Sequence, residues 1–176
     1  MFPLSVDPSH RFLTDASGLP FFYAADTQWP LFWAYTLRDA ALIIERRAST
    51  GFTALQVSLL PFGNARAKAV GAHAFANAST LEPNEAYFTH AEAVLDLAAA
   101  KGLAVYLVPL WYNQVNSVHG AYGLAVTEAL CASFGSWLGR RWRTRSRSTS
   151  GLASSRRSTV KRPSRRAAGF KADRSC

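Results

Sequence analysis

The sequence predicts an α/β domain with parallel strands that follows a β-hairpin and precedes a basic tail. Short runs that are apolar on both faces alternate three times with amphipathic stretches of helical spacing, a pattern typical of strand–helix units. The chain has 176 residues, of which 49% are hydrophobic, so its length and composition suit one ordinary domain. The charge is divided, because residues 1–139 carry 7 Lys+Arg against 10 Asp+Glu, whereas residues 140–176 carry 13 Lys+Arg and only Asp173.

The first predicted elements are a hairpin, a strand and a helix. Residues 4–13 hold two short runs around an Asp-Pro-Ser-His turn, which predicts the hairpin. Residues 20–25 are apolar on both faces, which favours a strand buried in a parallel sheet. Residues 36–49 have apolar residues at helical spacing, with Thr36 as a plausible N-cap and Gly51 just beyond the end.

Two more strand–helix units follow along the chain. In order, the predicted elements are a strand at 52–60, a loop at 61–82, a helix at 83–101, a strand at 103–110, a loop at 111–120 and a helix at 124–138. Long loops after strands are often functional.

The last 37 residues differ from the rest in composition. Residues 140–176 contain 13 Lys+Arg and 11 Ser+Thr with no periodicity, so we expect them to be disordered. Their positive charge leaves nucleic-acid binding open as an alternative. We do not favour it, because regular Arg-Ser or Arg-Gly-Gly repeats are absent. A binding assay over a salt series, with a chain ending at Gly139 as control, distinguishes the two views.

Several classes of site are not expected. Neither the two cysteines nor the four histidines have metal-ligand spacing, so we expect no metal and no cofactor. His90 is expected on a helix surface and Cys131 among buried apolar residues. No apolar run approaches the roughly 20 residues of a membrane span. Residues 1–13 lack the pattern of a secretory signal, which leaves a cytoplasmic location as the default.

A series of short motifs resembles a known family. They are Arg11-Phe12-Leu13, Gly18-Leu19-Pro20-Phe21-Phe22, Ala25-Asp26-Thr27-Gln28-Trp29, Leu31-Phe32, Gly51-Phe52, Leu55-Gln56, Pro83-Asn84-Glu85-Ala86-Tyr87-Phe88, Lys101-Gly102-Leu103 and Val108-Pro109-Leu110-Trp111. In this order they resemble the N-terminal part of the apiosidase-like glycoside hydrolases, family 140, and its relatives of unknown function. The resemblance runs from about Leu4 to about Trp142.

The resemblance implies a (β/α)₈ barrel that hydrolyses polysaccharide side chains with one Asp and one Glu. A complete barrel takes roughly 250 residues, so residues 1–142 correspond to a hairpin and the first three βα units. In the family the Asp follows a fourth strand and the Glu lies later. Where that strand would begin, residues 144–148 are Thr-Arg-Ser-Arg-Ser. We interpret residues 143–176 as out-of-frame sequence in a frameshifted or truncated product; a natural short variant is the alternative.

The expected site lies at the carboxyl ends of the strands, where such barrels bind substrate. The candidate sugar-binding residues are Asp26, Trp29, Gln56, Trp111 and Asn113. Asp26 could instead cap the following turn, and Trp29 and Trp33 could fill the core. No catalytic residue is expected, because Glu82 and Glu85 flank a helix start and Glu45, Glu92, Asp96 and Glu128 are expected to be solvated on helices. The function predicted is an inactive hydrolase fragment; the alternative is a carbohydrate-binding or nucleic-acid-binding protein.

Overall fold

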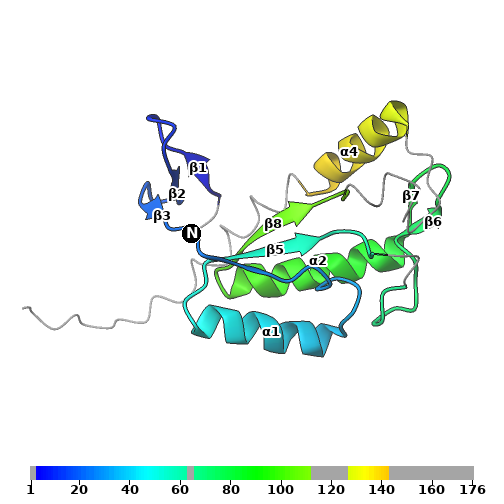
Figure 1. Ribbon diagram of the computed structural model, residues 1–176, viewed down its shortest axis with the longest axis horizontal. Coiled ribbons are helices and arrows are strands. Elements are labelled where there is room, and N and C mark those ends of the chain that lie inside the picture. Colours follow the sequence, from blue (N-terminus) through cyan, green and yellow to red (C-terminus); the bar gives the residue numbers. More distant parts are fainter. Residues whose placement is uncertain (1–2, 63–65, 112–126, 143–176) are drawn as a thin grey trace, which may run out of the picture.

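The computed structural model describes residues 3–62, 66–111 and 127–142. Its central element is a parallel sheet in the order β4-β5-β8, formed by Ala25–Thr27, Ala54–Ser58 and Ala104–Val108. Strands that follow one another in the chain are therefore neighbours in the sheet. Helices α1 (Leu37–Ser49) and α2 (Glu85–Ala100) connect them and lie on one side of the sheet (Figure 1). The predicted α/β class with parallel strands is confirmed.

The N-terminal hairpin is confirmed and is extended by a third strand. β1 (Ser5–Val6), β2 (Leu13–Thr14) and β3 (Pro20–Phe21) form an antiparallel sheet of their own. The prediction that residues 20–25 form one buried parallel strand is wrong, because β3 belongs to this sheet and β4 starts only at Ala25. Between them, the Thr53 hydroxyl donates to the Phe22 carbonyl and accepts from the Ala24 N–H. The Thr53 side chain therefore holds this part of the chain together with the Ala24 carbonyl, which accepts from the N–H groups of Thr53 and Ala54.

The first two helices begin as their sequence predicts. The Thr36 hydroxyl caps α1 by accepting from the Asp39 N–H, and the Asn84 side chain caps α2 by accepting from the Ala86 N–H. The expected loop at 61–82 is partly ordered into a small antiparallel pair, β6 (Phe75–Asn77) with β7 (Glu82–Pro83).

The last helix was predicted to end near Leu138, but α4 spans Glu128–Trp142. Its final turn holds Arg141 and Trp142, which bind acids of α2 as described below. This tertiary contact stabilises a turn that the local pattern does not favour on its own, because Gly139 weakens it.

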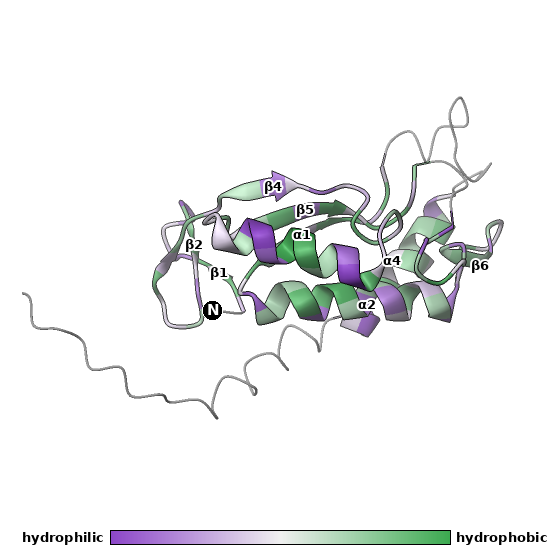
Figure 2. Cartoon of the chain, turned by 90° about the horizontal axis from the view of Figure 1, so that it is seen from below, coloured by the Kyte–Doolittle hydropathy of each residue, from purple (hydrophilic) through white to green (hydrophobic). Residues whose placement is uncertain are grey.

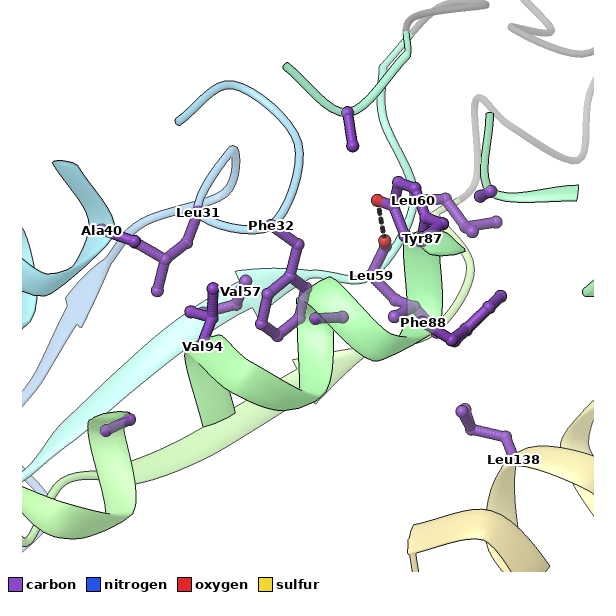
Figure 3. Close-up of a cluster of buried hydrophobic side chains, with 14 of the residues drawn as sticks. Leu31, Phe32, Ala40, Val57, Leu59, Leu60, Tyr87, Phe88, Val94 and Leu138 are labelled. Carbon is purple, nitrogen blue, oxygen red and sulfur yellow. Dashed lines mark hydrogen bonds between the residues drawn. The ribbon is translucent and has the colours of Figure 1, made fainter. Parts of the chain in front are cut away.

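The core lies between the parallel sheet and the helices α1 and α2. Leu55 and Val57 of β5 are fully buried in one cluster with Ile44 of α1 and Val94 of α2. In Figure 2 the hydrophobic colour is concentrated on β5 and along α2. Figure 3 shows Phe32 in this cluster beside Val57 and Val94. Burial of these apolar side chains is the main force that fixes both helices on the sheet.

The opposite face of the sheet is buried at Ala54 and Ser58 of β5 and is more exposed on the outer strands. Side chains alternate along a strand, so Gln56 points away from the face that holds Leu55 and Val57. Thr27 and Tyr106 are its register partners and share its face. Tyr106 is 55% exposed.

A second aromatic cluster joins α2 to α4; we call Phe88, Phe134, Trp137 and Trp142 the closed cluster. The ring centroids of Phe88 and Trp137 are 4.7 Å apart, and those of Phe134 and Trp137 are 5.9 Å apart. Phe88 is fully buried and Phe134 is 3% exposed. These edge-to-face and stacked contacts dock α4 against the N-terminal half of α2.

Three expectations about polar residues are corrected. Glu92 was expected in solvent, but it accepts hydrogen bonds from Arg141 Nε at 2.7 Å and from Trp142 Nε1 at 2.9 Å. His90 was expected on the surface, but it is 7% exposed because α2 turns this side chain toward the segment that connects β4 to α1. Cys131 was expected to be buried and is half-buried. None of these contacts is local in sequence.

Candidate functional site

Four aromatic side chains gather near the carboxyl ends of the parallel strands. Trp29 follows β4, Phe62 follows β5 and Trp111 follows β8, while Trp33 lies between β4 and α1. We call these four residues the open cluster. In Figure 1 the arrowheads of β5 and β8 point toward this end of the sheet.

The open cluster is a connected set of edge-to-face contacts. The ring centroids of Trp29 and Trp111 are 4.9 Å apart at an interplanar angle of 62°. Phe62 links the remaining rings, with centroids 6.4 Å from Trp111 and 6.1 Å from Trp33. Phe62 and Trp111 are 37% and 38% exposed, so this cluster presents ring surface to solvent. Such a surface can accept the apolar face of a flat ligand.

Backbone hydrogen bonds hold the segment that carries the two half-buried tryptophans. The Ser58 N–H donates to the Trp29 carbonyl at 3.2 Å, and the Lys68 N–H donates to the Trp33 carbonyl at 2.8 Å. The segment is therefore tied to the end of β5 on one side and to the 66–73 loop on the other. The tryptophans sit on a supported loop, as binding residues commonly do.

Asp26 forms its ion pair with Arg47 on the face of the sheet that packs on the helices. It is the register partner of the buried Leu55 and so shares the face of the sheet that packs on the helices. There it forms an ion pair with Arg47 of α1, and Gln28 Nε2 donates to it at 2.6 Å. Burial raises the pKa of Asp26, but the hydrogen bonds from Gln28 and Arg47 and the charge of Arg47 outweigh it and hold the pKa below its ordinary value.

Comparison with known proteins decides the family. The family model for the apiosidase-like catalytic domain matches residues 7–156. The chain belongs to the apiosidase-like family. The resemblance seen in the motifs is thereby confirmed, and this match reaches past residue 142.

Solved structures agree with the family at the level of the fold. A glycoside hydrolase matches the apiosidase-like domain with a TM-score of 0.66 at 22% identity, over 79% of this chain and 31% of that chain. A glycoside hydrolase family 5 protein from Bacteroides vulgatus matches with a TM-score of 0.67 at 19% identity, over 79% and 30%. The chain thus spans less than a third of either structure. No curated protein matches it significantly.

The apiosidase-like domain brings together some of the predicted sugar-binding residues. Trp29 and Trp111 are in contact within the open cluster, whereas Asp26 lies on the helix-facing side of the sheet. Gln56 is half-buried on the opposite face, and Asn113 lies outside the described residues. Contact of each with a sugar stays a prediction.

Sequence reasoning missed Phe62. It follows β5 by four positions, much as Trp111 follows β8 by three, and that parallel is the signal that could have found it. Residues 61–82 were expected to form one loop, and the local pattern does not distinguish Phe62 from the rest of it.

Four carboxylates of the described residues form ion pairs with basic side chains. Among residues 3–62, 66–111 and 127–142, Asp26 is the one acid on the parallel sheet. The ion-paired acids besides Asp26 are Glu45 with Lys101 and Glu85 and Glu92 with Arg141. No group of three or more His, Cys, Asp or Glu in these ranges could hold a metal ion. No helix in them is long and apolar enough to cross a membrane.

Proposed function

We propose that this chain is the N-terminal portion of a barrel glycoside hydrolase, and that it binds polysaccharide side chains without cleaving them. In this proposal β4, α1, β5, α2 and β8 belong to the first three βα units of a (β/α)₈ barrel within residues 1–142. Residues 143–176 are a separate Arg/Ser-rich tail. The observation that carries the proposal is the open cluster, because it exposes aromatic rings at the strand ends where barrel enzymes bind substrate.

The proposed lack of turnover follows from the carboxylates. Glycosidases place two carboxyl groups about 5–5.5 Å apart for retention or about 6.5–9.5 Å apart for inversion. Among the described residues no second carboxylate accompanies Asp26 on the sheet, and Asp26 is itself paired with Arg47.

Tryptophan fluorescence during titration with soluble plant polysaccharides tests the binding. Replacing Trp111 with Ala removes one exposed ring and is expected to weaken binding about fivefold, since a stacked ring contributes about 1 kcal/mol. Phe22→Ala is the matched control, because Phe22 is 78% exposed but precedes β4 at the other end of the sheet. Equal losses in both variants would contradict a site at the open cluster.

Hydrolysis of a panel of aryl glycosides tests the second half of the proposal. The wild-type chain is expected to release no phenol above the rate in buffer. Turnover that disappears in Asp26→Asn would overturn this, because it would assign Asp26 a catalytic role.

The origin of residues 143–176 is tested on the gene. Translation of the other two reading frames from the codon of Leu130 onward is expected to restore an Asn-Ile-Ile-Trp-like strand and a Gly-Gly-Asp. If neither frame does so, the tail is genuine and nucleic-acid binding becomes the question. The control for that assay ends after Trp142 and not after Gly139, because α4 continues to Trp142.

A further inference from the structure

Two buried hydroxyl groups lie where β5 ends and the chain continues toward the open cluster. The Tyr87 hydroxyl of α2 donates to the Leu59 carbonyl at 2.7 Å, a contact drawn in Figure 3. The Ser58 hydroxyl donates to the Leu60 carbonyl at 2.9 Å. Tyr87 and Ser58 are both fully buried, and a hydroxyl in such a place costs free energy unless it is hydrogen-bonded. Phe and Ala would avoid this requirement, so packing alone does not account for the two hydroxyls.

The two carbonyls belong to the segment that carries Phe62. The N–H of Leu59 donates to the Val108 carbonyl of β8 at 2.9 Å, which continues the contact between the strands one residue beyond β5. Past this contact, the two hydroxyls supply hydrogen bonds to the carbonyls of Leu59 and Leu60. The carbonyls of the residues three and two positions before Phe62 are thus tied to buried side chains.

Pro61 connects these supported carbonyls to Phe62. Its ring locks its own φ angle and restricts the backbone of Leu60 before it. Pro61 is also fully buried. Few backbone angles therefore remain free between the Leu60 carbonyl and the Phe62 side chain. A displacement of the carbonyls is expected to move the Phe62 ring.

We propose that Tyr87 and Ser58 are positioning residues, whose hydroxyls set the place of the Phe62 ring in the open cluster by holding two carbonyls of the segment that carries it. The ligand that would meet this ring rests on the function proposed above, whereas the place of the ring is measured without any ligand. The two proposals can therefore fail separately.

The test removes one hydroxyl at a time from the full chain. Tyr87→Phe keeps the aromatic ring, and Ser58→Ala keeps the backbone hydrogen bonds of that position. The indole N–H resonances of Trp33 and Trp111, assigned with Trp→Phe variants, report the place of the Phe62 ring. Its ring current reaches both indoles, because the ring centroids are 6.1 and 6.4 Å apart. We expect both resonances to shift in each variant.

A double substitution separates movement of the Phe62 ring from a general disturbance of the fold. Phe62→Leu removes the ring current and is expected to shift both indole resonances by itself. If the Tyr87 hydroxyl acts through this ring, Tyr87→Phe causes no further shift in the Phe62→Leu background.

Two control variants accompany the test. Tyr23→Phe removes a hydroxyl from a side chain that is 47% exposed and precedes β4, at the other end of the sheet. Leu138→Ala is expected to lower stability from α4, where Leu138 is 7% exposed and lies apart from Leu59 (Figure 3). Both controls are expected to leave the indole resonances of Trp33 and Trp111 in place.

The same variants are titrated with the soluble plant polysaccharides used for Trp111→Ala. Tyr87→Phe and Ser58→Ala are each expected to weaken binding about threefold, because a displaced ring keeps part of its stacking contact. Tyr23→Phe is expected to bind as the wild type does.

Three outcomes overturn the positioning role. They are unchanged indole resonances in folded Tyr87→Phe or folded Ser58→Ala, equal shifts in a control variant, and a further shift when Tyr87→Phe is added to Phe62→Leu. If one variant does not fold, the other decides alone, since each removes a different hydroxyl. Resonances that behave as expected in a chain that binds no polysaccharide would support positioning and contradict the proposed function.

Discussion

The molecule holds two aromatic clusters whose rings are similarly spaced but differently exposed to solvent. The closest rings are 4.9 Å apart in the open cluster and 4.7 Å apart in the closed cluster, and both pairs meet edge to face. Phe134 of the closed cluster is 3% exposed, whereas Trp111 of the open cluster is 38% exposed. Ring spacing alone therefore does not distinguish a binding surface from a core; the cover over the rings does.

The closed cluster is covered by a charged side chain whose partners are in place. The Arg141 guanidinium lies 5.1 Å from the Trp137 ring centroid and 5.9 Å from that of Phe88. It also donates to Glu85 and Glu92, and Trp142 Nε1 donates to Glu92. Within the described residues, no Arg or Lys lies over a ring of the open cluster. Arg141 thus covers rings of the closed cluster, whereas Phe62 and Trp111 of the open cluster are more than a third exposed.

The largest expected effect comes from removing a ring of the closed cluster. Phe88 is fully buried and contacts the rings of Tyr87, Phe134, Trp137 and Trp142. Replacing Phe88 with Ala is expected to lower the free energy of unfolding by about 3–5 kcal/mol, because transfer energy is lost and a cavity remains. Denaturant-induced unfolding followed by circular dichroism measures it. A loss below about 1 kcal/mol would mean that this cluster is not part of the core.

The second-largest effect on stability is expected from removing Arg141, which lies over two rings of the closed cluster. Arg141 and Glu92 have side chains only 19% and 17% exposed, so their ion pair is screened little by water. Arg141→Ala is expected to cost about 2 kcal/mol of unfolding free energy, since two acids lose a charged donor. Arg140→Ala is the matched control on the neighbouring exposed position and is expected to change stability by less than about 0.5 kcal/mol. Equal losses of stability in Arg141→Ala and Arg140→Ala would show that the contacts of Arg141 do not stabilise the fold.

The third effect is a dependence of stability on pH through His90. Burial is the main cause that lowers the pKa of His90 below its ordinary value of 6.5. The unfolded chain therefore binds a proton at a higher pH than the folded chain. Stability from this residue is complete above pH 6.5 and decreases as the pH falls toward the folded pKa, by at most about 1.4 kcal/mol per pH unit.

Midpoints of denaturant-induced unfolding measured between pH 7 and pH 5 test whether stability decreases as the pH falls. His90→Asn cannot titrate and is expected to show a flatter profile than the wild type over that range. A wild-type profile that is no steeper than that of His90→Asn would contradict the assignment.

The smallest effect on stability is expected at the open cluster. Trp111 is 38% exposed, so Trp111→Ala removes less buried area than Phe88→Ala and is expected to lower the free energy of unfolding by less than about 1 kcal/mol. The same unfolding assay applies. A loss as large as that of Phe88→Ala would show that the open cluster is a core and would weaken the case for binding there.

The parts of the fold that local sequence determines could be predicted. The caps of α1 and α2, at Thr36 and Asn84, involve residues two or three positions apart, and the strand–helix alternation follows from periodicity. The division of residues 20–25 between two sheets depends on Thr53, which lies about thirty positions later. The last turn of α4 depends on acids of α2, 49 or more positions before Arg141. Such contacts leave no local pattern.

In the candidate site, too, features set by local sequence could be predicted and features set by distant contacts could not. The position of Trp29 and Trp111 near the carboxyl ends of the strands could be predicted, because each residue follows a predicted strand closely in the chain. The side of the sheet on which Asp26 lies depends on where β4 begins, since neighbouring side chains alternate between faces. Locating that start required the contact between Thr53 and Phe22. The burial of His90 on α2 likewise could not be predicted from the local helical pattern.

The two outer strands of the parallel sheet have consequences for how copies of the chain associate. In the described residues β4 and β8 each pair with β5 alone, and all three strands run in the same direction. A second copy that continues this sheet with parallel strands places its β4 beside β8 of the first, which is a head-to-tail contact that leaves a free strand at each end. Two copies that pair the same outer strand antiparallel about a two-fold axis instead form a closed pair. The direction of the pairing therefore decides between a filament and a dimer.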